Sequence, residues 1–213
     1  MSGLVLVACE YSGTVRDAFL RAGIPAVSCD ILPCESNMNQ VVLANLPYGG
    51  HYQGDVFDII EEHPWAMMIA HPPCTHLSVS GARWFPPHTQ PGEPGFKPLH
   101  LRFEALAFVD RLMHSSIPMI AIENPLSVIS GQIRKADQSI QPWQFGHTES
   151  KRTCLWLKNL PPLEHTLNVY DEMMLLPLKV RNRIHWLGSG SGKERSKFYT
   201  GIAEAMAQQW GPS

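Results

Sequence analysis

Three short apolar runs most strongly restrict the folds open to this chain. They occupy residues 4–9, 65–70 and 118–122. Each run is apolar along its whole length, which predicts a strand buried on both faces. Strands of this kind belong to parallel sheets that are covered by helices on both sides. We therefore expect an α/β fold with a mostly parallel, doubly wound sheet in three layers.

The first run opens a strand–helix–strand unit. A polar turn at residues 10–13 leads into helical spacing over residues 14–22, and a second strand over residues 25–30 ends in an acid. The strands of such a unit present their carboxyl ends at one edge of the sheet, where the ligands of open α/β sheets bind. We expect a ligand site at this edge.

The residues at this edge favour a nucleotide-type ligand. Ser12 and Gly13 let a ligand approach the backbone at a helix amino terminus, and Asp30 can accept hydrogen bonds from ribose hydroxyls. The turn has one glycine where the dinucleotide fingerprint has three, and Glu10 repels a pyrophosphate. S-adenosylmethionine, with its ribose and positive tail, fits better. The alternatives are a plain strand–helix–strand unit with a solvated loop and, for Asp55, a helix cap instead of a contact to an adenine amino group.

The second run stops at two prolines, and Cys74 follows them. Proline has no N–H to give to a strand ladder, so the strand ends there and the cysteine stands on a stiff turn. A thiol in this place is a candidate nucleophile, because thiolate is the most nucleophilic side chain near neutral pH. A half-buried structural cysteine is the alternative. The third run ends in the same manner, with Glu123 and Asn124 before another proline.

Composition excludes several classes of protein. The 213 residues suit one domain, and 17 basic against 19 acidic side chains lack the basic footprint of a dedicated nucleic-acid binder. The five cysteines are odd in number and form no C-x-x-C pair, which argues against a disulfide framework and a thiolate zinc site. We expect no metal. With no signal-peptide pattern and no apolar run of about 18 residues, we expect a cytoplasmic protein without a membrane partner.

Taken in chain order, these motifs resemble those of the cytosine carbon-5 DNA methyltransferase family, and more closely small phage-type proteins described as cytosine methyltransferase-like. The matching segments are residues 7–13 (the first S-adenosylmethionine loop), Asp30 (the ribose acid), residues 54–56 (the adenine-binding acid), residues 72–74 with Ser78 and Gly81 (the Pro-Cys turn), residues 123–125 (the Glu-Asn-Val motif), residues 151–152 (the Gln-x-Arg segment) and residues 200–203 (the carboxyl-terminal motif).

The resemblance implies a Rossmann-like, S-adenosylmethionine-dependent methyltransferase fold and a covalent mechanism on cytosine. In that mechanism the Cys74 thiolate adds to carbon 6, and Glu123 hydrogen-bonds or protonates ring nitrogen 3. Arg152 contacts the base carbonyl and helps to lower the thiol pKa, and Asn124 positions the turn. The cofactor-binding residues that the resemblance implies are Glu10, Tyr11, Ser12, Gly13, Asp30, Ile31, Asp55 and Pro72.

The chain departs from the family pattern at several positions. Thr75 replaces the glutamine after the cysteine, and Pro125 replaces the valine after Glu-Asn. We expect one catalytic domain over residues 1–213, with a lid-like Pro/Gly-rich loop at 83–98 and a short insert at about 161–198 where the family has a target-recognition domain. DNA is the first expected substrate. The alternatives are a pyrimidine nucleotide, another base modification on the same scaffold, or a non-catalytic protein that binds cofactor or nucleic acid.

Overall fold

The computed structural model describes residues 3–38, 43–187 and 192–212 of the chain. Within these residues a seven-stranded sheet has the order β3-β2-β1-β4-β5-β7-β6. Its first five strands are parallel, β7 runs antiparallel to β5, and β6 runs antiparallel to β7. The strands are β1 Leu4–Ala8, β2 Ala26–Asp30, β3 His51–Gln53, β4 Trp65–Ala70, β5 Met119–Pro125, β6 Gln138–Ile140 and β7 Thr153–Lys158.

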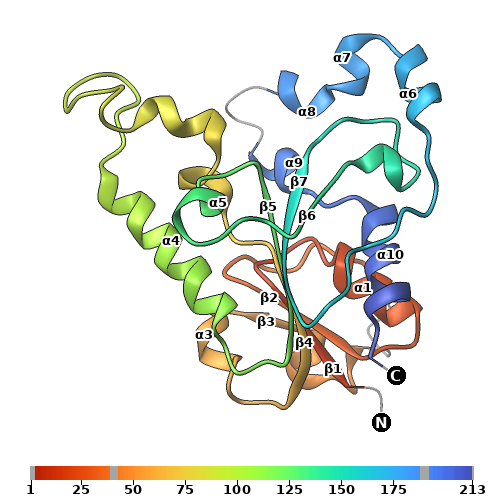
Figure 1. Cartoon of the computed structure of the whole chain (residues 1–213). Helices are drawn as coiled ribbons and strands as arrows, with labels where there is room; N and C mark the ends of the chain where they lie inside the picture. The colour runs from red at the N-terminus through yellow and green to blue at the C-terminus, as the bar shows by residue number, and fades with distance from the viewer. Residues whose placement is uncertain (1–2, 39–42, 188–191, 213) are drawn as a thin grey trace.

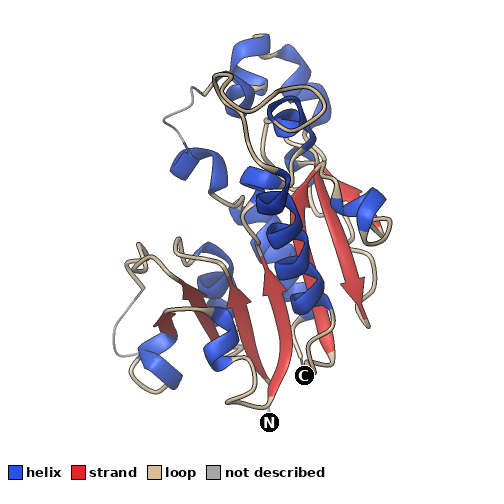
Figure 2. Cartoon of the chain, turned by 90° about the vertical axis from the view of Figure 1, so that its left-hand side faces the viewer, coloured by secondary structure: helices blue, strands red, loops and turns tan. Residues whose placement is uncertain are grey.

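Helices cover both faces of the sheet (Figures 1 and 2). Helices α1 (Thr14–Arg21) and α10 (Thr200–Trp210) pack on one face, and α3 (Val56–Ile59) and α4 (Leu99–Met113) pack on the other. The predicted fold class, a mostly parallel and doubly wound sheet in three layers, is therefore confirmed. The remaining helices are α5 Ile129–Gln132, α6 Tyr170–Leu175, α7 Leu178–Arg181, α8 Arg183–Trp186 and α9 Gly192–Ser196, with 3-10 turns at Pro47–Gly50, Cys74–His76, Val79–Trp84 and Pro142–Gln144.

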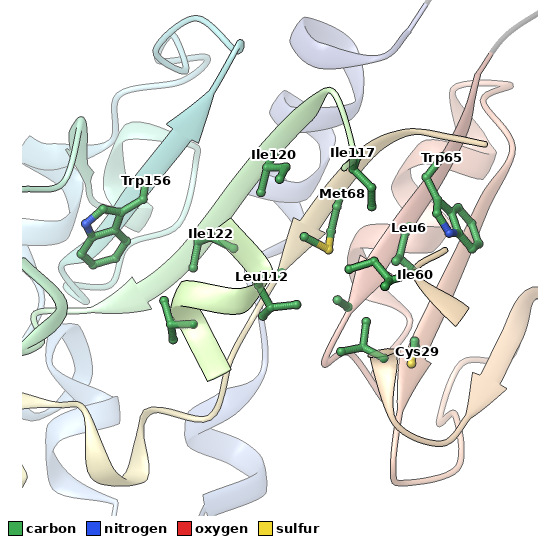
Figure 3. Packing of buried hydrophobic residues seen from close by; sticks show 14 of the residues in the cluster. Leu6, Cys29, Ile60, Trp65, Met68, Leu112, Ile117, Ile120, Ile122 and Trp156 are labelled. Atoms are coloured by element: carbon green, nitrogen blue, oxygen red, sulfur yellow. The ribbon is translucent and has the colours of Figure 1, made fainter. Parts of the chain in front are cut away.

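The apolar runs are continuous because successive side chains enter two different cores. In β1, Val5 and Val7 pack with α1 and α10, whereas Leu6 and Ala8 pack with α3 and α4. Figure 3 shows the second of these cores, where Leu6, Met68 and Ile122 meet Leu112 of helix α4. Burial of both faces is the physical reason why no polar residue interrupts these strands.

Strand register brings four chain segments to one edge of the sheet. Ala8 pairs with Cys29 and with Ala70, and Ala70 pairs with Ile122. The residues that follow these four stand side by side at the carboxyl ends of β1, β2, β4 and β5. Strand β1 lies between β2 and β4, so the strand order changes direction here, as it does at the ligand-binding crevice of open α/β sheets.

The third apolar run makes a longer strand than the sequence predicts. The strand does not end at Ile122. Strand β5 continues to Pro125, which pairs with Thr153 of β7. The antiparallel neighbour extends the ladder, and the proline takes the last position of the strand, where one missing donor is tolerated. Glu123 and Asn124 therefore lie inside a strand instead of directly after its end.

The loop that was expected as a lid lies close to the Cys74 turn. Its first two residues belong to the turn at Val79–Trp84, and residues 85–98 contain no helix or strand. The Lys97 ammonium donates to the carbonyl of Thr75 at 3.1 Å, which joins the loop to the turn. The expected insert contains α6 to α9, of which α6, α7 and α8 lie at the top of Figure 1, and its residues 188–191 lie outside the described residues. Within the described residues, no helix has both the length and the apolar character needed to cross a membrane.

Candidate active site

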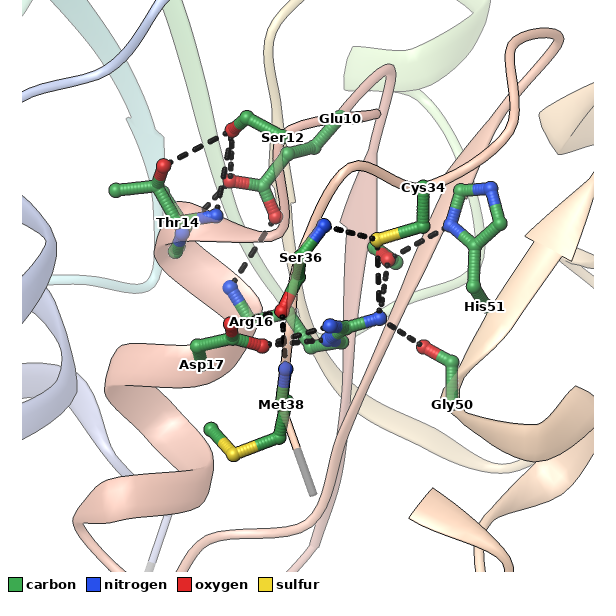
Figure 4. A network of polar contacts seen from close by, with 12 residues as sticks. Glu10, Ser12, Thr14, Arg16, Asp17, Cys34, Ser36, Met38, Gly50 and His51 are labelled. Carbon is green, nitrogen blue, oxygen red and sulfur yellow. Dashed lines mark hydrogen bonds and ion pairs between the residues drawn. The ribbon is translucent and has the colours of Figure 1, made fainter. Parts of the chain in front are cut away.

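The turn after β1 is closed by its own glutamate. Glu10 is 4% exposed, and its carboxylate accepts hydrogen bonds from the N–H groups of Val15 at 2.6 Å and Arg16 at 3.2 Å (Figure 4). Burial raises the pKa of Glu10, against the opposing effects of His71 and of these N–H groups. Glu10 therefore caps helix α1 and uses the donors that a phosphate would need.

The other residues of this turn are held by local contacts. The Ser12 hydroxyl lies 3.3 Å from a Glu10 oxygen and 3.0 Å from the Thr14 hydroxyl. The Tyr11 hydroxyl shares a hydrogen bond of 2.9 Å with Ser196, which joins the turn to α9. Gly13 has a φ of 72°, a left-handed conformation that glycine adopts without strain.

A buried arginine that was not among the predicted site residues organises the region beneath the turn. Arg16 of α1 is 1% exposed, and its guanidinium donates to the carbonyl of Gly50 at 3.1 Å and to the Ser28 hydroxyl at 3.3 Å. The same group pairs with Asp17 at 2.7 Å and lies 3.4 Å from the Cys34 sulfur. Figure 4 shows how this network joins α1, β2 and the loop after β2. The helical position beside Val15 on the buried face was the only signal.

One acid stands at the end of β2 and another stands just after β3. Asp30 is the last residue of β2 and accepts a hydrogen bond from the N–H of Leu32 at 2.9 Å, and the neighbouring Ile31 is 75% exposed. Asp55 accepts from the N–H of Phe57 at 3.0 Å and caps α3, which is the alternative that the sequence left open. Burial raises the pKa of Cys29 to about 12, and the negative charges of Asp30 and Asp55 contribute smaller parts of this rise. The Cys29 thiol therefore stays protonated near neutral pH.

Cys74 is the exposed one of the five cysteines, and it begins the turn after β4. Although the residue is exposed, desolvation of its sulfur raises the pKa of Cys74, and the nearby Glu123 raises it further. Lys151 and Arg195 act in the opposite direction and lower the pKa of this thiol. The turn itself is fixed by strand β5, because the side-chain amide of Asn124 donates to the carbonyl of Pro72 at 2.8 Å.

Glu123 is a nearly buried carboxylate with charged and polar partners. Its Oε2 lies 3.1 Å from Nδ1 of His71, and the Thr153 hydroxyl also hydrogen-bonds it. Burial alone would raise the pKa of Glu123, but His71, Lys151 and Thr153 together outweigh burial and lower it. The carboxylate is therefore ionised near neutral pH, when no ligand is bound.

Of the two adjacent cations before β7, it is the lysine that acts on this group of residues. Lys151 influences Cys74 and Glu123, whereas Arg152 is among the charges that act on the buried thiol of Cys154. Neighbouring residues of an extended chain point to opposite faces, so the pairing of β5 with β7 decides which of the two faces the site. The structure thus brings Cys74, Glu123, Asn124 and Pro72 together, and it adds His71, Lys151 and Thr153, to which the sequence had assigned no role in the site.

Comparison with known proteins finds similar structures. Neither a family model nor a curated protein sequence matches the chain. A DNA modification methyltransferase encoded within a prophage of E. coli has a TM-score of 0.42 and 15% identity, covering 83% of this chain and 56% of that chain. A mutant of Spodoptera frugiperda DNMT2 has a TM-score of 0.38 and 16% identity, covering 76% of this chain and 53% of that chain. The S. pombe Dnmt2 methyltransferase has a TM-score of 0.40 and 18% identity, covering 83% of this chain and 55% of that chain. The chain spans a little over half the length of these proteins.

Proposed function

We propose that this chain is an S-adenosylmethionine-dependent methyltransferase that acts on carbon 5 of cytosine, and DNA is the first candidate substrate. One observation carries the proposal. An exposed thiol, Cys74, stands beside a nearly buried carboxylate, Glu123, at the carboxyl ends of two adjacent parallel strands. A packed core needs neither group in this place, whereas covalent catalysis on a pyrimidine needs both.

The residues at the neighbouring strand ends fit the cofactor. Asp30 offers a carboxylate for ribose hydroxyls at the point where the strand order changes direction. Ile31, beside it, exposes an apolar side chain on which an adenine ring can pack. Gly13 gives the first turn its left-handed conformation, while the Glu10 carboxylate serves the helix. When bound, the cofactor supplies the methyl group.

The protein residues have separate tasks in the proposed reaction. The Cys74 thiolate forms a bond to carbon 6 of the cytosine ring, and carbon 5 becomes enamine-like. Glu123 interacts with ring nitrogen 3, so that negative charge does not accumulate on the ring. Asn124 holds the turn that carries the thiol, and Lys151 stabilises the thiolate form of Cys74. After methyl transfer, carbon 5 loses its proton and the thiolate leaves.

A free pyrimidine nucleotide is the second candidate substrate. The insert between β7 and α10 consists of four short helices in the described residues, α6 to α9, and the chain carries a net charge of −2. Duplex recognition requires groups that contact phosphates and hold the gap left by a flipped base. A small insert and a near-neutral charge therefore favour a smaller substrate than a duplex.

Calorimetric titration with S-adenosylmethionine tests the cofactor. We expect binding to the wild type and a loss of about tenfold or more in affinity for Asp30→Ala, because a charge-assisted hydrogen bond to ribose is removed. Asp110→Ala, on the exposed surface of α4, is the matched control and should bind normally. Absence of binding to the wild type would remove the basis of the proposal.

Transfer of a labelled methyl group tests the reaction. The substrates are duplex DNA, single-stranded DNA, RNA and cytidine nucleotides, and Cys74→Ser should abolish transfer while cofactor binding survives. An oligonucleotide that contains 5-fluorocytosine should form a lasting adduct with Cys74, detected by mass spectrometry, because fluorine cannot leave carbon 5 as a proton does. Full activity of Cys74→Ser would contradict the covalent mechanism.

A further inference from the structure

His71 is a largely covered histidine with no task in the proposed reaction. It is the first residue after β4, and its main-chain N–H donates to the main-chain carbonyl of Ala8 at 2.9 Å. Its side chain is 12% exposed, and Nδ1 lies 3.1 Å from Oε2 of Glu123. Its Nε2 is buried and has no hydrogen-bond partner in the described part of the chain. Glu123 is thus the group with which this ring exchanges a hydrogen bond.

The surroundings of the ring are charged on several sides. Glu123 faces it from β5 and Glu10 lies near it from the turn after β1; the charge of His71 lowers the pKa of both carboxyl groups. Lys151, ahead of β7, acts on the same Glu123, and the ring of Phe198 covers the imidazole at a centroid distance of 4.7 Å. Two carboxyl groups thus flank one imidazole in a largely dry place.

We propose that His71 is the proton partner of Glu123: it holds this carboxylate in position and supplies the proton that reaches ring nitrogen 3 of the cytosine. This inference rests on the proposed function. His71 acts through Glu123 and is therefore a positioning residue that also stores a proton. The need for it follows from the ionised state of Glu123, since a carboxylate without a proton has none to give.

The proton balance of the addition step is simple. The Cys74 sulfur forms a bond to carbon 6, and the electron pair of the C5–C6 double bond moves into the ring. The Nδ1–H bond of His71 breaks, its proton passes to Glu123, and a proton passes from Glu123 to nitrogen 3. His71 ends neutral, Glu123 ends ionised as it began, and the ring carries the proton that balances the new sulfur–carbon bond. The reverse transfer accompanies departure of the thiolate.

The first test measures the pair without any reaction. The variant is His71→Asn, whose side-chain N–H can still donate to Glu123 but carries no charge. We expect the carbon-13 carboxyl resonance of Glu123 to titrate at a higher pH in this variant than in the wild type, because the imidazole charge that favours the carboxylate is gone. His114→Asn is the matched control, since His114 pairs with Asp110 on the exposed surface of α4. An unchanged titration of Glu123 in His71→Asn would overturn the proposal.

The second test measures methyl transfer against pH. We expect His71→Asn and His71→Ala each to lose about a hundredfold in kcat, the typical contribution of a positioned acid. The wild-type profile should rise as Cys74 ionises and fall once no proton is left for ring nitrogen 3, and the asparagine variant should lack the falling limb. Rescue of both rate and profile by asparagine would show a merely structural role and would overturn the proposal.

The two proposals fail in different ways. A wild type that transfers no methyl group to any of the substrates removes the proposed function, and with it the catalytic task of His71. The titration of Glu123 still decides whether His71 and Glu123 form a proton-coupled pair. Conversely, if the wild type and the His71→Asn variant were both fully active, the proposed function would stand and the role of His71 as proton partner of Glu123 would be contradicted.

Discussion

The side-chain amide of Asn124 donates a hydrogen bond to the main-chain carbonyl of Pro72, with a nitrogen–oxygen distance of 2.8 Å. Asn124 is 1% exposed, so this bond lies in the interior and joins β5 to the turn that presents Cys74. A proline turn has fewer donors with which to tie itself to the sheet, since proline has no N–H. This bond therefore helps to set the position of the thiol relative to Glu123.

Replacing this asparagine should cost stability out of proportion to its size. Asn124→Ala leaves the carbonyl of Pro72 unpaired in the interior, which should lower the free energy of unfolding by about 1–3 kcal/mol. Urea denaturation measures the change. Asn159→Gly is the matched control, because Asn159 makes the same type of bond, to Pro118 at 2.8 Å, on the exposed surface and has a positive φ of 54° that glycine tolerates. Equal losses in the two variants would contradict this account.

The ionisation of Cys74 should respond to Lys151 more than to Arg152. The Lys151 charge lowers the pKa of this thiol, so Lys151→Met should raise that pKa and slow alkylation near neutral pH by about twofold to tenfold. Glu123→Gln should have the opposite effect, because the Glu123 charge raises the pKa. The measurement is the pH dependence of iodoacetamide labelling at Cys74, read by peptide mass spectrometry. A larger effect of Arg152→Met would favour the assignment made from the sequence resemblance.

The sheet could be predicted from the sequence because burial on two faces leaves a pattern that a single chain shows. The run at residues 65–70 corresponds to β4 without a change of boundary. The antiparallel strands β6 and β7 left no such signal of direction, since the pairing of Pro125 with Thr153 joins distant parts of the chain. For the same reason the sequence placed the end of β5 too early and gave no means of choosing between Lys151 and Arg152.

Local capping explains why acidic residues were harder to interpret. Glu10 and Asp55 both stand at the start of a helix, and in both cases the structure shows the carboxylate bound to helix N–H groups. A carboxylate beside a helix start has the same sequence pattern whether it serves the helix or a ligand. The buried position of Arg16 was likewise beyond reach, because its partners come from β2, the following loop and the turn at Gly50.

Three glycines separate crowding from backbone strain. At Gly13 the φ is 72°, and an added Cβ would stand 2.6 Å from the Cβ of Ser36. At Gly23 the φ is 78°, but an added Cβ would meet open space. At Gly131 an added Cβ meets open space and the φ is not positive. Alanine should therefore destabilise most at Gly13, by about 1 kcal/mol at Gly23, and not at all at Gly131. Thermal unfolding of the three variants gives the order. Equal effects at Gly13 and Gly23 would show that the loop after β2 moves aside without cost.

Arg16 should be the most costly polar residue to replace. Arg16→Met keeps the length of the side chain but leaves the Gly50 carbonyl and Asp17 without their buried partner, so the free energy of unfolding should fall by about 2–4 kcal/mol. Arg134→Met is the matched control, because the Arg134–Asp137 pair is about 40% exposed and should contribute less than about 1 kcal/mol.

The same substitution connects stability to the proposed cofactor site. The Arg16 guanidinium holds Cys34, and the loop that contains Cys34 begins directly after Asp30 with Ile31. We therefore expect Arg16→Met to weaken binding of S-adenosylmethionine even at temperatures where the variant is fully folded, as circular dichroism verifies. Unchanged affinity in the folded variant would mean that Asp30 and Ile31 are positioned by β2 alone. The network in Figure 4 would then serve stability without serving the site.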